Sequence, residues 1–297
     1  ADRLFPTLRA WGALIVISPG KGLSRVRVSK LVDGRMIDRK DVVAVEEPLE
    51  IRVEFTRDGA WETTAVSVTM RTPGDDFELT AGFLFGEGLV RDREDIAEIS
   101  YCQDDEKQNY NIVVVKLRPG TFFDVDALSR NFYVSSSCGV CGKGSLEAVE
   151  VRGCQPLPDE GLRLDPELLV TLPESLRSGQ GLFDRTGGIH AAGRFDETGK
   201  LISVSEDVGR HNAVDKVVGQ AFLAGDLALT RTILMVSGRT SFEILQKALA
   251  AGVPVVAAVG APSSLAVDLA TTFNITLLGF TRSDGFNVYA GSGRILG

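Results

Sequence analysis

The last third of the chain alternates short apolar runs with helical patterns, and this alternation restricts the possible folds more than any other feature. The runs and the helical segments follow one another over residues 233–236, 242–251, 255–259, 265–273 and 275–278. Strands that are apolar throughout and separated by helices are typical of a parallel sheet with helices on both faces. An amphipathic pattern over residues 213–223, ended by Gly225, precedes them. We therefore predict a three-layer α/β domain over residues 146–297.

The first half of the chain is rich in strand patterns. Residues 49–55 alternate apolar and charged side chains, and residues 110–117 form a β-branched run that is followed by Pro-Gly. Between them, residues 75–86 carry apolar side chains at helical spacing. We predict an α+β domain of mostly antiparallel strands over residues 23–134, which makes the whole chain α/β in class and α+β overall.

Polar residues at the expected helix starts predict how these helices are capped. Asp75 or Asp76 is expected to cap the first helix, and Asn212 the amphipathic one. Thr240 and Glu243 have the spacing of a capping box at the start of the next helix.

Composition and charge exclude several classes of protein. The 297 residues are 44% hydrophobic and 24% charged, which is typical of a globular protein of about two domains rather than of a disordered one. The longest compact apolar run, residues 10–17, is too short to cross a membrane, so we interpret residues 1–22 as a leader or a short strand. A net charge of −8 argues against nucleic acid or an anionic membrane as a partner. Four cysteines are too few for a disulfide framework and favour the reducing cytoplasm.

A C-x-x-C pair, Cys138 and Cys141, lies among serines and glycines in residues 135–145. Such a stretch is typical of a mobile loop between domains. A structural zinc ion would need two further ligands at suitable spacing, and neither a second C-x-x-C nor a histidine pair follows in the sequence, so we predict no metal.

Two other chemistries compete for the same pair. A thioredoxin-like redox pair opens a helix, whereas the three glycines around these cysteines favour a mobile loop. A sulfur carrier holds sulfur as a persulfide on one thiolate, and a neighbouring thiol can attack the inner sulfur and release sulfide. Lys143 would favour the thiolate that this chemistry needs.

Three polar loops are candidates for binding a ligand. In residues 206–212, Arg210 and His211 precede a helix, where anions are attracted, although capping and a surface ion pair explain them as well. The other two loops follow strands of the predicted parallel sheet, whose carboxyl ends gather ligands. Their candidate residues are Ser237, Gly238, Arg239 and Thr240 in one loop, and Phe280, Thr281, Arg282, Ser283, Asp284 and Gly285 in the other.

Arg282 could bind phosphate, Asp284 could accept hydrogen bonds from a base or sugar, and Phe280 could pack on a ring. His190 is a further candidate, in residues 186–192. Zinc deaminases carry H-x-E followed by P-C-x-x-C, but Ala192 replaces the glutamate here and the C-x-x-C lies upstream. A structural role for this histidine is as well supported as a ligand-binding one.

Taken together, the motifs resemble those of the formate dehydrogenase accessory sulfurtransferases of the FdhD family. The resemblance covers residues 46–297. It rests on five motifs in order: SCGVCG at 137–142, TGGIHAA at 186–192, EDVGRHNAVDK at 206–216, SGR at 237–239 and FTRSDG at 280–285.

The resemblance implies a function and its residues. A cysteine desulfurase would pass sulfur to Cys138 as a persulfide, with Cys141 as its partner, for delivery to a bis(molybdopterin guanine dinucleotide) molybdenum or tungsten cofactor. This sulfuration would be needed for formate dehydrogenase activity. The loop 280–285 would bind the cofactor, and the same likeness favours His190, Arg210 and Arg239 as ligand-facing groups.

The resemblance also implies a cytidine-deaminase-like fold for the second domain, without the deaminase zinc site, and a homodimer. Two alternatives remain at this point. The protein could be a non-catalytic chaperone that binds the cofactor, or a thiol–disulfide oxidoreductase.

Overall fold

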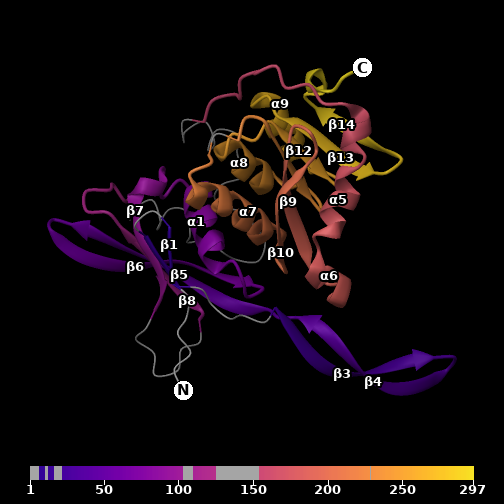
Figure 1. Ribbon diagram of the computed structural model, residues 1–297, viewed down its shortest axis with the longest axis horizontal. Coiled ribbons are helices and arrows are strands. Elements are labelled where there is room, and N and C mark those ends of the chain that lie inside the picture. The colour runs from indigo at the N-terminus through magenta and orange to yellow at the C-terminus, as the bar shows by residue number, and fades with distance from the viewer. Residues whose placement is uncertain (1–6, 11–12, 17–21, 103–109, 125–153, 228) are drawn as a thin grey trace.

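The computed structural model describes residues 7–10, 13–16, 22–102, 110–124, 154–227 and 229–297. Its strands form two six-stranded sheets and one two-stranded ribbon. Figure 1 shows the sheet of the first half and the sheet of the second half as separate layers, with helices α1 and α7 lying between them. The chain is therefore of mixed α/β class.

The first sheet has the strand order β1-β2-β7-β8-β5-β6. Its strands are β1 (Thr7–Ala10), β2 (Ala13–Val16), β5 (Glu47–Arg57), β6 (Ala60–Arg71), β7 (Ile96–Tyr101) and β8 (Ile112–Leu117). The pairs β2–β7 and β5–β8 are parallel, and the other neighbours are antiparallel, as predicted for most of this sheet. Leu49, Ile51, Val53 and Phe55 of β5 are buried in strict alternation, which confirms the strand predicted from residues 49–55.

Helix α1 (Asp76–Gly86) packs its apolar side chains against the first sheet. The predicted helix is confirmed. Asp75, one of the two residues predicted to cap it, is the N-cap in a left-handed conformation, but its side chain makes no capping bond. The Asp76 carboxylate instead accepts two hydrogen bonds from the Arg71 guanidinium, both of 3.0 Å, and one of 2.9 Å from the Tyr101 hydroxyl. A charged, bidentate partner satisfies this buried carboxylate better than a backbone amide could.

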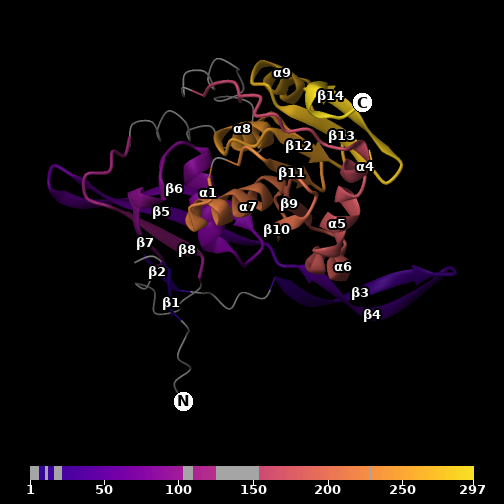
Figure 2. The same cartoon turned by 45° about the horizontal axis from the view of Figure 1, so that its top comes forward.

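A two-stranded ribbon, which we call the arm, comprises β3 (Leu23–Val32) and β4 (Arg35–Ala44). Ten residue pairs join its strands, and Asp33 and Gly34 form the turn with positive φ angles of 49° and 75°. An Asp-Gly pair at such angles is typical of a tight hairpin turn. The arm projects away from both sheets (Figures 1 and 2), and the sequence patterns we used did not predict it.

The second sheet has the order β10-β9-β11-β12-β13-β14. Its strands are β9 (His190–Asp196), β10 (Leu201–Asp207), β11 (Thr232–Val236), β12 (Val255–Ala258), β13 (Thr276–Arg282) and β14 (Gly285–Ala290). The three central strands β11, β12 and β13 are parallel, as predicted, whereas β9, β10 and β14 pair antiparallel.

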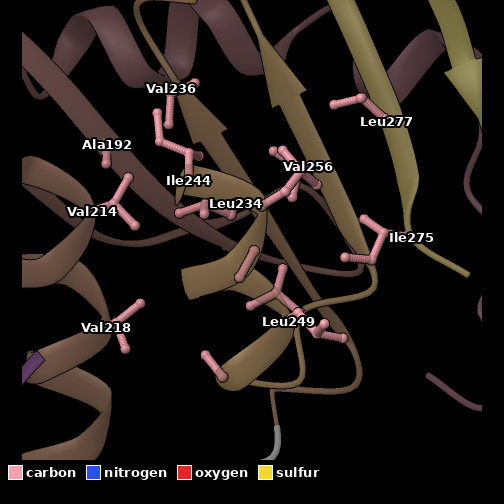
Figure 3. Packing of buried hydrophobic residues seen from close by; sticks show 14 of the residues in the cluster. Ala192, Val214, Val218, Leu234, Val236, Ile244, Leu249, Val256, Ile275 and Leu277 are labelled. Carbon is pink, nitrogen blue, oxygen red and sulfur yellow. The ribbon is translucent and has the colours of Figure 1, made fainter. Parts of the chain in front are cut away.

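Helices cover both faces of the second sheet. On one face, α7 (Arg210–Ala224), α8 (Phe242–Ala250) and α9 (Ser264–Thr272) enclose one apolar cluster, part of which Figure 3 shows. On the other face, α4 (Pro166–Leu169) and α5 (Leu172–Ser178) pack on a second cluster. The short α6 (Gly181–Thr186) follows, and single turns of 3-10 helix lie at Arg93–Asp95 and Ser292–Arg294. This is the layered arrangement that the strand–helix alternation predicted.

The two halves meet where α1 crosses α7. Gly82 of α1 and Gly219 of α7 face each other, so that the backbones touch. A Cβ atom added at Gly82 would overlap the carbonyl oxygen of Asp215 and lie 2.8 Å from the Gly219 nitrogen. One added at Gly219 would overlap the carbonyl oxygen of Glu78. Only glycine at both positions allows this approach.

Candidate functional site

Three loops meet at the carboxyl ends of the parallel strands. The Gly260 amide, after β12, donates to the Gly238 carbonyl oxygen, after β11, over 3.0 Å. The Phe280 amide in β13 donates to the Gly260 carbonyl oxygen over 3.1 Å. The loop after β11 and the segment 280–285 therefore lie on one edge of the sheet, which we call the strand-end edge. The parallel strands predicted this position.

His190 joins this edge because β9 runs antiparallel to β11. The first residue of β9 therefore lies beside the loop after β11, and the Ala191 amide donates to the Ser237 Oγ over 2.9 Å. A Cβ atom at Gly238 would lie only 3.2 Å from the His190 Nδ1. A glycine at this position thus leaves room for the imidazole next to the loop.

The protonation of His190 depends on its surroundings. Its ring is half-buried, and this burial lowers the pKa below that of an ordinary histidine; the positive charges of Arg210 and His211 lower it further. A neutral imidazole keeps one nitrogen able to accept a hydrogen bond. The Nε of Arg210 is buried and has no hydrogen-bond partner among the described residues.

The first turn of α7 is tied to the first turn of α8. His211 Nε2 lies 3.0 Å from the Ser241 Oγ and 2.9 Å from a Glu243 carboxylate oxygen. Its hydrogen bond to that carboxylate holds the pKa of Glu243 below the usual value. The predicted capping box of Thr240 and Glu243 is therefore wrong: Ser241 is the N-cap of α8, without a side-chain capping bond, and Glu243 binds His211 instead.

Segment 280–285 forms the end of the β13–β14 hairpin, because β13 continues to Arg282 and pairs with Gly285. The sequence patterns predicted a strand that ends at residue 278, so they missed this extension and β14. Phe280 has a positive φ of 52° and is 41% exposed. Arg282, Ser283 and Asp284 are exposed, as a ligand-binding role requires. Thr281 is fully buried, and its Oγ1 has no partner among the described residues.

Three side chains of the 206–216 motif, those of Asp207, Asn212 and Lys216, join the two halves of the chain. The Asp207 carboxylate accepts a hydrogen bond of 3.1 Å from the Thr72 amide and forms an ion pair with the Lys216 Nζ at 2.9 Å. All three residues are buried. Lys216 Nζ also donates to the Thr72 carbonyl oxygen over 3.0 Å. A buried charge pair of this kind needs further hydrogen bonds to be tolerated, and the backbone of Thr72 supplies them.

Asn212 belongs to the same contact between the two halves and does not cap α7, contrary to the prediction. Gly209 is the N-cap, and the Asn212 amide nitrogen donates to the Met70 carbonyl oxygen over 2.7 Å and to Asp207 over 2.9 Å. Glu206 has another structural role, because its carboxylate accepts from the Leu182 and Phe183 amides at the start of α6. Within the motif, Arg210 and His211 are thus the two side chains that we assign to the strand-end edge.

The two cysteines of the C-x-x-C pair, Cys138 and Cys141, lie outside the described residues, as does the whole segment 135–145. The described chain stops at Asp124 in the first half and resumes at Cys154, so this segment connects the two sheets. Cys102 and Cys154 are partly buried. Within the described ranges, no three His, Cys, Asp or Glu side chains gather closely enough to hold a metal ion. None of the described helices is long and apolar enough to cross a membrane.

The fold and this edge place the chain among the α/β proteins whose polar loops gather at the carboxyl ends of parallel strands, the usual ligand-binding position of such sheets. The chain belongs to the FdhD/NarQ family, whose model matches residues 44–296.

Named relatives extend over nearly the whole chain. Proteins called sulfur carrier protein FdhD from Streptomyces coelicolor and Mycobacterium tuberculosis are 50% and 49% identical to it. Each comparison covers 93% of this chain, and 96% and 99% of the relative, respectively. A crystal structure from Desulfotalea psychrophila, described as that of a formate dehydrogenase accessory protein, superposes with a TM-score of 0.71 at 26% identity. It covers 93% of this chain and 100% of its own.

Proposed function

We propose that this chain is a sulfur carrier that acts through a cysteine persulfide in the maturation of formate dehydrogenase. The observation that carries the proposal is the 50% identity to proteins named sulfur carrier protein FdhD over 93% of the chain. The segment between the two sheets contains the cysteine pair that this role requires. A persulfide carrier needs free thiolates, so we assign it to the reducing cytoplasm.

Sulfur transfer through Cys138 takes two steps. The Cys138 thiolate attacks the terminal sulfur of the persulfide on a cysteine desulfurase, which forms Cys138–S–SH and releases the desulfurase cysteine as a thiolate. The terminal sulfur then leaves as sulfide, with the electron pair of the S–S bond, when a thiolate attacks the inner sulfur, and it passes to the substrate, a bis(molybdopterin guanine dinucleotide) cofactor of molybdenum or tungsten. If Cys141 supplies that thiolate, a Cys138–Cys141 disulfide remains for a cellular thiol to reduce.

The strand-end edge is our candidate site for the cofactor as cargo. Arg210, Arg239 and Arg282 can bind phosphate groups, and the exposed ring of Phe280 can pack on a base. Buried polar atoms without partners among the described residues, the Arg210 Nε and the Thr240 and Thr281 Oγ1, flank the same edge. Such orphaned groups are rare in a finished core and favour a polar ligand beside them.

The remaining family expectations fit within this proposal. A parallel central sheet with helices on both faces supports the cytidine-deaminase-like relationship of the second domain. His190 would then serve as a hydrogen-bonding group for the ligand rather than as a zinc ligand. We also propose cysteine desulfurase and formate dehydrogenase as partners, and a second copy of the chain.

The persulfide is tested directly by intact mass spectrometry. After incubation with a cysteine desulfurase and cysteine, the protein is expected to gain the mass of one sulfur atom, which dithiothreitol removes. Cys138→Ala should gain none, whereas the matched variant Cys102→Ala should gain it normally. An unmodified wild-type protein would contradict the proposal and favour a cofactor-binding chaperone. A reversible loss of two hydrogens without added sulfur would indicate a thiol–disulfide oxidoreductase.

Binding of guanine nucleotides tests the cargo site. GDP should bind more tightly than ADP by about one to two orders of magnitude, because a carboxylate facing guanine accepts from two donors that adenine does not present there. Asp284→Ala is expected to remove most of this preference while it weakens phosphate binding less. The matched control is Asp268→Ala, an exposed carboxylate on α9. Equal GDP and ADP affinities in calorimetric titrations of the wild type would refute the role of Asp284.

A further inference from the structure

Helices α7 and α8 lie side by side and run in the same direction (Figures 1 and 2), and two charged contacts join them. In the first turn, His211 Nε2 of α7 lies 2.9 Å from a Glu243 carboxylate oxygen of α8. One turn further along, Asp215 of α7 binds the Lys247 Nζ of α8 over 2.6 Å. The acid and the base exchange helices between the two turns, so a slide by one turn would place like charges opposite each other. These contacts therefore fix the His211 ring at the end of the loop after β11.

The contacts of the His211 ring determine which of its nitrogens carries the hydrogen. Nε2 makes both of its contacts, with Glu243 and with the Ser241 Oγ at 3.0 Å. The hydrogen bond from His211 holds the pKa of Glu243 below its usual value, and an ionised carboxylate can only accept. Nε2 therefore carries the hydrogen and donates it to Glu243. Nδ1 has no hydrogen-bond partner among the described residues, and the side chain is 31% exposed, so Nδ1 is the nitrogen left for a ligand.

The charge of the ring decides what Nδ1 can bind. In a neutral ring with its hydrogen on Nε2, Nδ1 carries a lone pair and can only accept a hydrogen bond. In the imidazolium, Nδ1 also carries a hydrogen and can donate it to an anion in a charge-assisted bond. An oxyanion placed at Nδ1 therefore favours the protonated ring, and its binding is coupled to the uptake of one proton from solvent.

Among the described carboxylates near α7, the charge of Glu243 is the one left to act on His211. The other acidic groups have basic partners. These are Asp215 with Lys247, Asp207 of β10 with Lys216, and Asp76 of α1 with Arg71. Burial raises the pKa of Glu78 on α1, which favours its neutral form. Glu243 therefore stabilises a positive charge on His211.

Two basic neighbours oppose that positive charge. Burial and the positive charges of Arg210 and His211 lower the pKa of His190 on β9, so His190 is the group that stays neutral. The Nε of Arg210 is buried and has no partner among the described residues. A guanidinium and an imidazolium that lie close together repel each other, and one carboxylate, that of Glu243, does not neutralise both. An anionic ligand between them would supply the missing negative charge.

We propose that His211 binds the phosphate groups of the cargo through Nδ1–H as an imidazolium, and that Glu243 is the positioning residue that holds the ring for this contact. The inference rests on the cargo site of the proposed function, and it adds the residue and the charge state by which that site recognises an anion. Binding should be strongest at low pH and should weaken as the pH rises and the ring loses its proton.

Nuclear magnetic resonance can follow the ring directly, because the chain contains only two histidines. A His190→Gln variant identifies which of the two imidazole signals belongs to His211. Saturation with GDP should move the midpoint of the His211 titration to higher pH by about one pH unit. Because linkage is reciprocal, GDP should bind about tenfold more weakly at about pH 9 than at about pH 6. GDP itself gains negative charge over this range, which alone would strengthen binding, so the weakening reports the protein.

Substitutions separate the binding residue from the positioning residue. His211→Gln should bind GDP with nearly the same affinity at both pH values. Glu243→Gln removes the carboxylate that stabilises the imidazolium, so it should move the His211 midpoint to lower pH and weaken GDP binding at neutral pH. The matched control is Glu174→Gln, an exposed first-turn glutamate on α5, which should change neither measurement.

The outcomes distinguish this inference from the proposed function. GDP binding that leaves the His211 midpoint unchanged would overturn the inference alone. Equal effects of Glu243→Gln and Glu174→Gln would overturn the role of Glu243. A wild type that binds no GDP would overturn the inference together with the cargo site, whereas the sulfur gained in the mass measurement tests sulfur transfer independently.

Discussion

Gly219→Ala is expected to lower the free energy of unfolding by roughly 3–5 kcal/mol, the upper range for an overpacked core position. The added methyl group would occupy the position of the Glu78 carbonyl oxygen, which is backbone and cannot rotate away. The helices α1 and α7 must separate to make room, and the buried contacts between the two halves weaken with them. Urea unfolding monitored by circular dichroism measures the change.

The reciprocal variant, Gly82→Ala, should have a similar cost, because its methyl group meets the Asp215 carbonyl oxygen on the facing helix. Gly181→Ala in α6 is the matched control, since nothing lies within 4 Å of the position of the new Cβ atom. This control should be neutral or slightly stabilising, as expected for alanine replacing a helical glycine. Stability losses below about 1 kcal/mol at both Gly82 and Gly219 would show that the crossing is not as close as described.

Local patterns predicted the regular part of the fold because periodicity reports which faces are buried. Residues 233–236 of β11, 255–258 of β12 and 277–278 of β13 are all apolar and buried, and buried parallel strands need that property. The arm escaped prediction for the opposite reason: outside a short alternating run at residues 25–29, its strands mix apolar and charged residues without alternation, since neither face packs on a core. That short run and the Asp33-Gly34 turn were the local signals available.

The candidate site was likewise predictable from the sequence only in part. The order of parallel strands was enough to place the loop after β11 near segment 280–285. The roles of Asn212 and Lys216 were not predictable, because their partners, Met70 and Thr72, lie more than a hundred positions away in the sequence. A lysine between the apolar residues Val214 and Val217 of the predicted helix was the available signal, since a buried lysine is almost never found without a partner.

The contact between the two halves of the chain links the fold to the candidate site. Helix α7 carries Gly219 and Lys216, which hold it against the first half, and its first turn carries Arg210 and His211 at the strand-end edge. The contact between the halves therefore also fixes where these two side chains stand. A polar site needs its groups held in place, and the buried contact between α7 and the first half supplies that support.

Cys138→Ala is expected to abolish the activation of formate dehydrogenase, down to the level measured without the accessory protein. The proposed mechanism has no other atom to hold the transferred sulfur, so the loss should be complete rather than partial. The variant should keep the wild-type urea midpoint and GDP affinity, because the strand-end edge and the α1–α7 crossing are formed by other residues. Formate dehydrogenase activity after maturation in cells that lack the native accessory protein measures the effect.

The other cysteines provide the controls and a further distinction. Cys102→Ala and Cys154→Ala, at partly buried positions, should leave activation near the wild-type level. Cys141→Ala should reduce it. If Cys141 releases sulfide by forming a disulfide with Cys138, this variant should accumulate the persulfide on Cys138 yet fail to deliver it, and the added sulfur should remain visible by mass. Full activation by Cys138→Ala would refute the persulfide assignment, because the sulfur would then travel by a route that does not include this thiol.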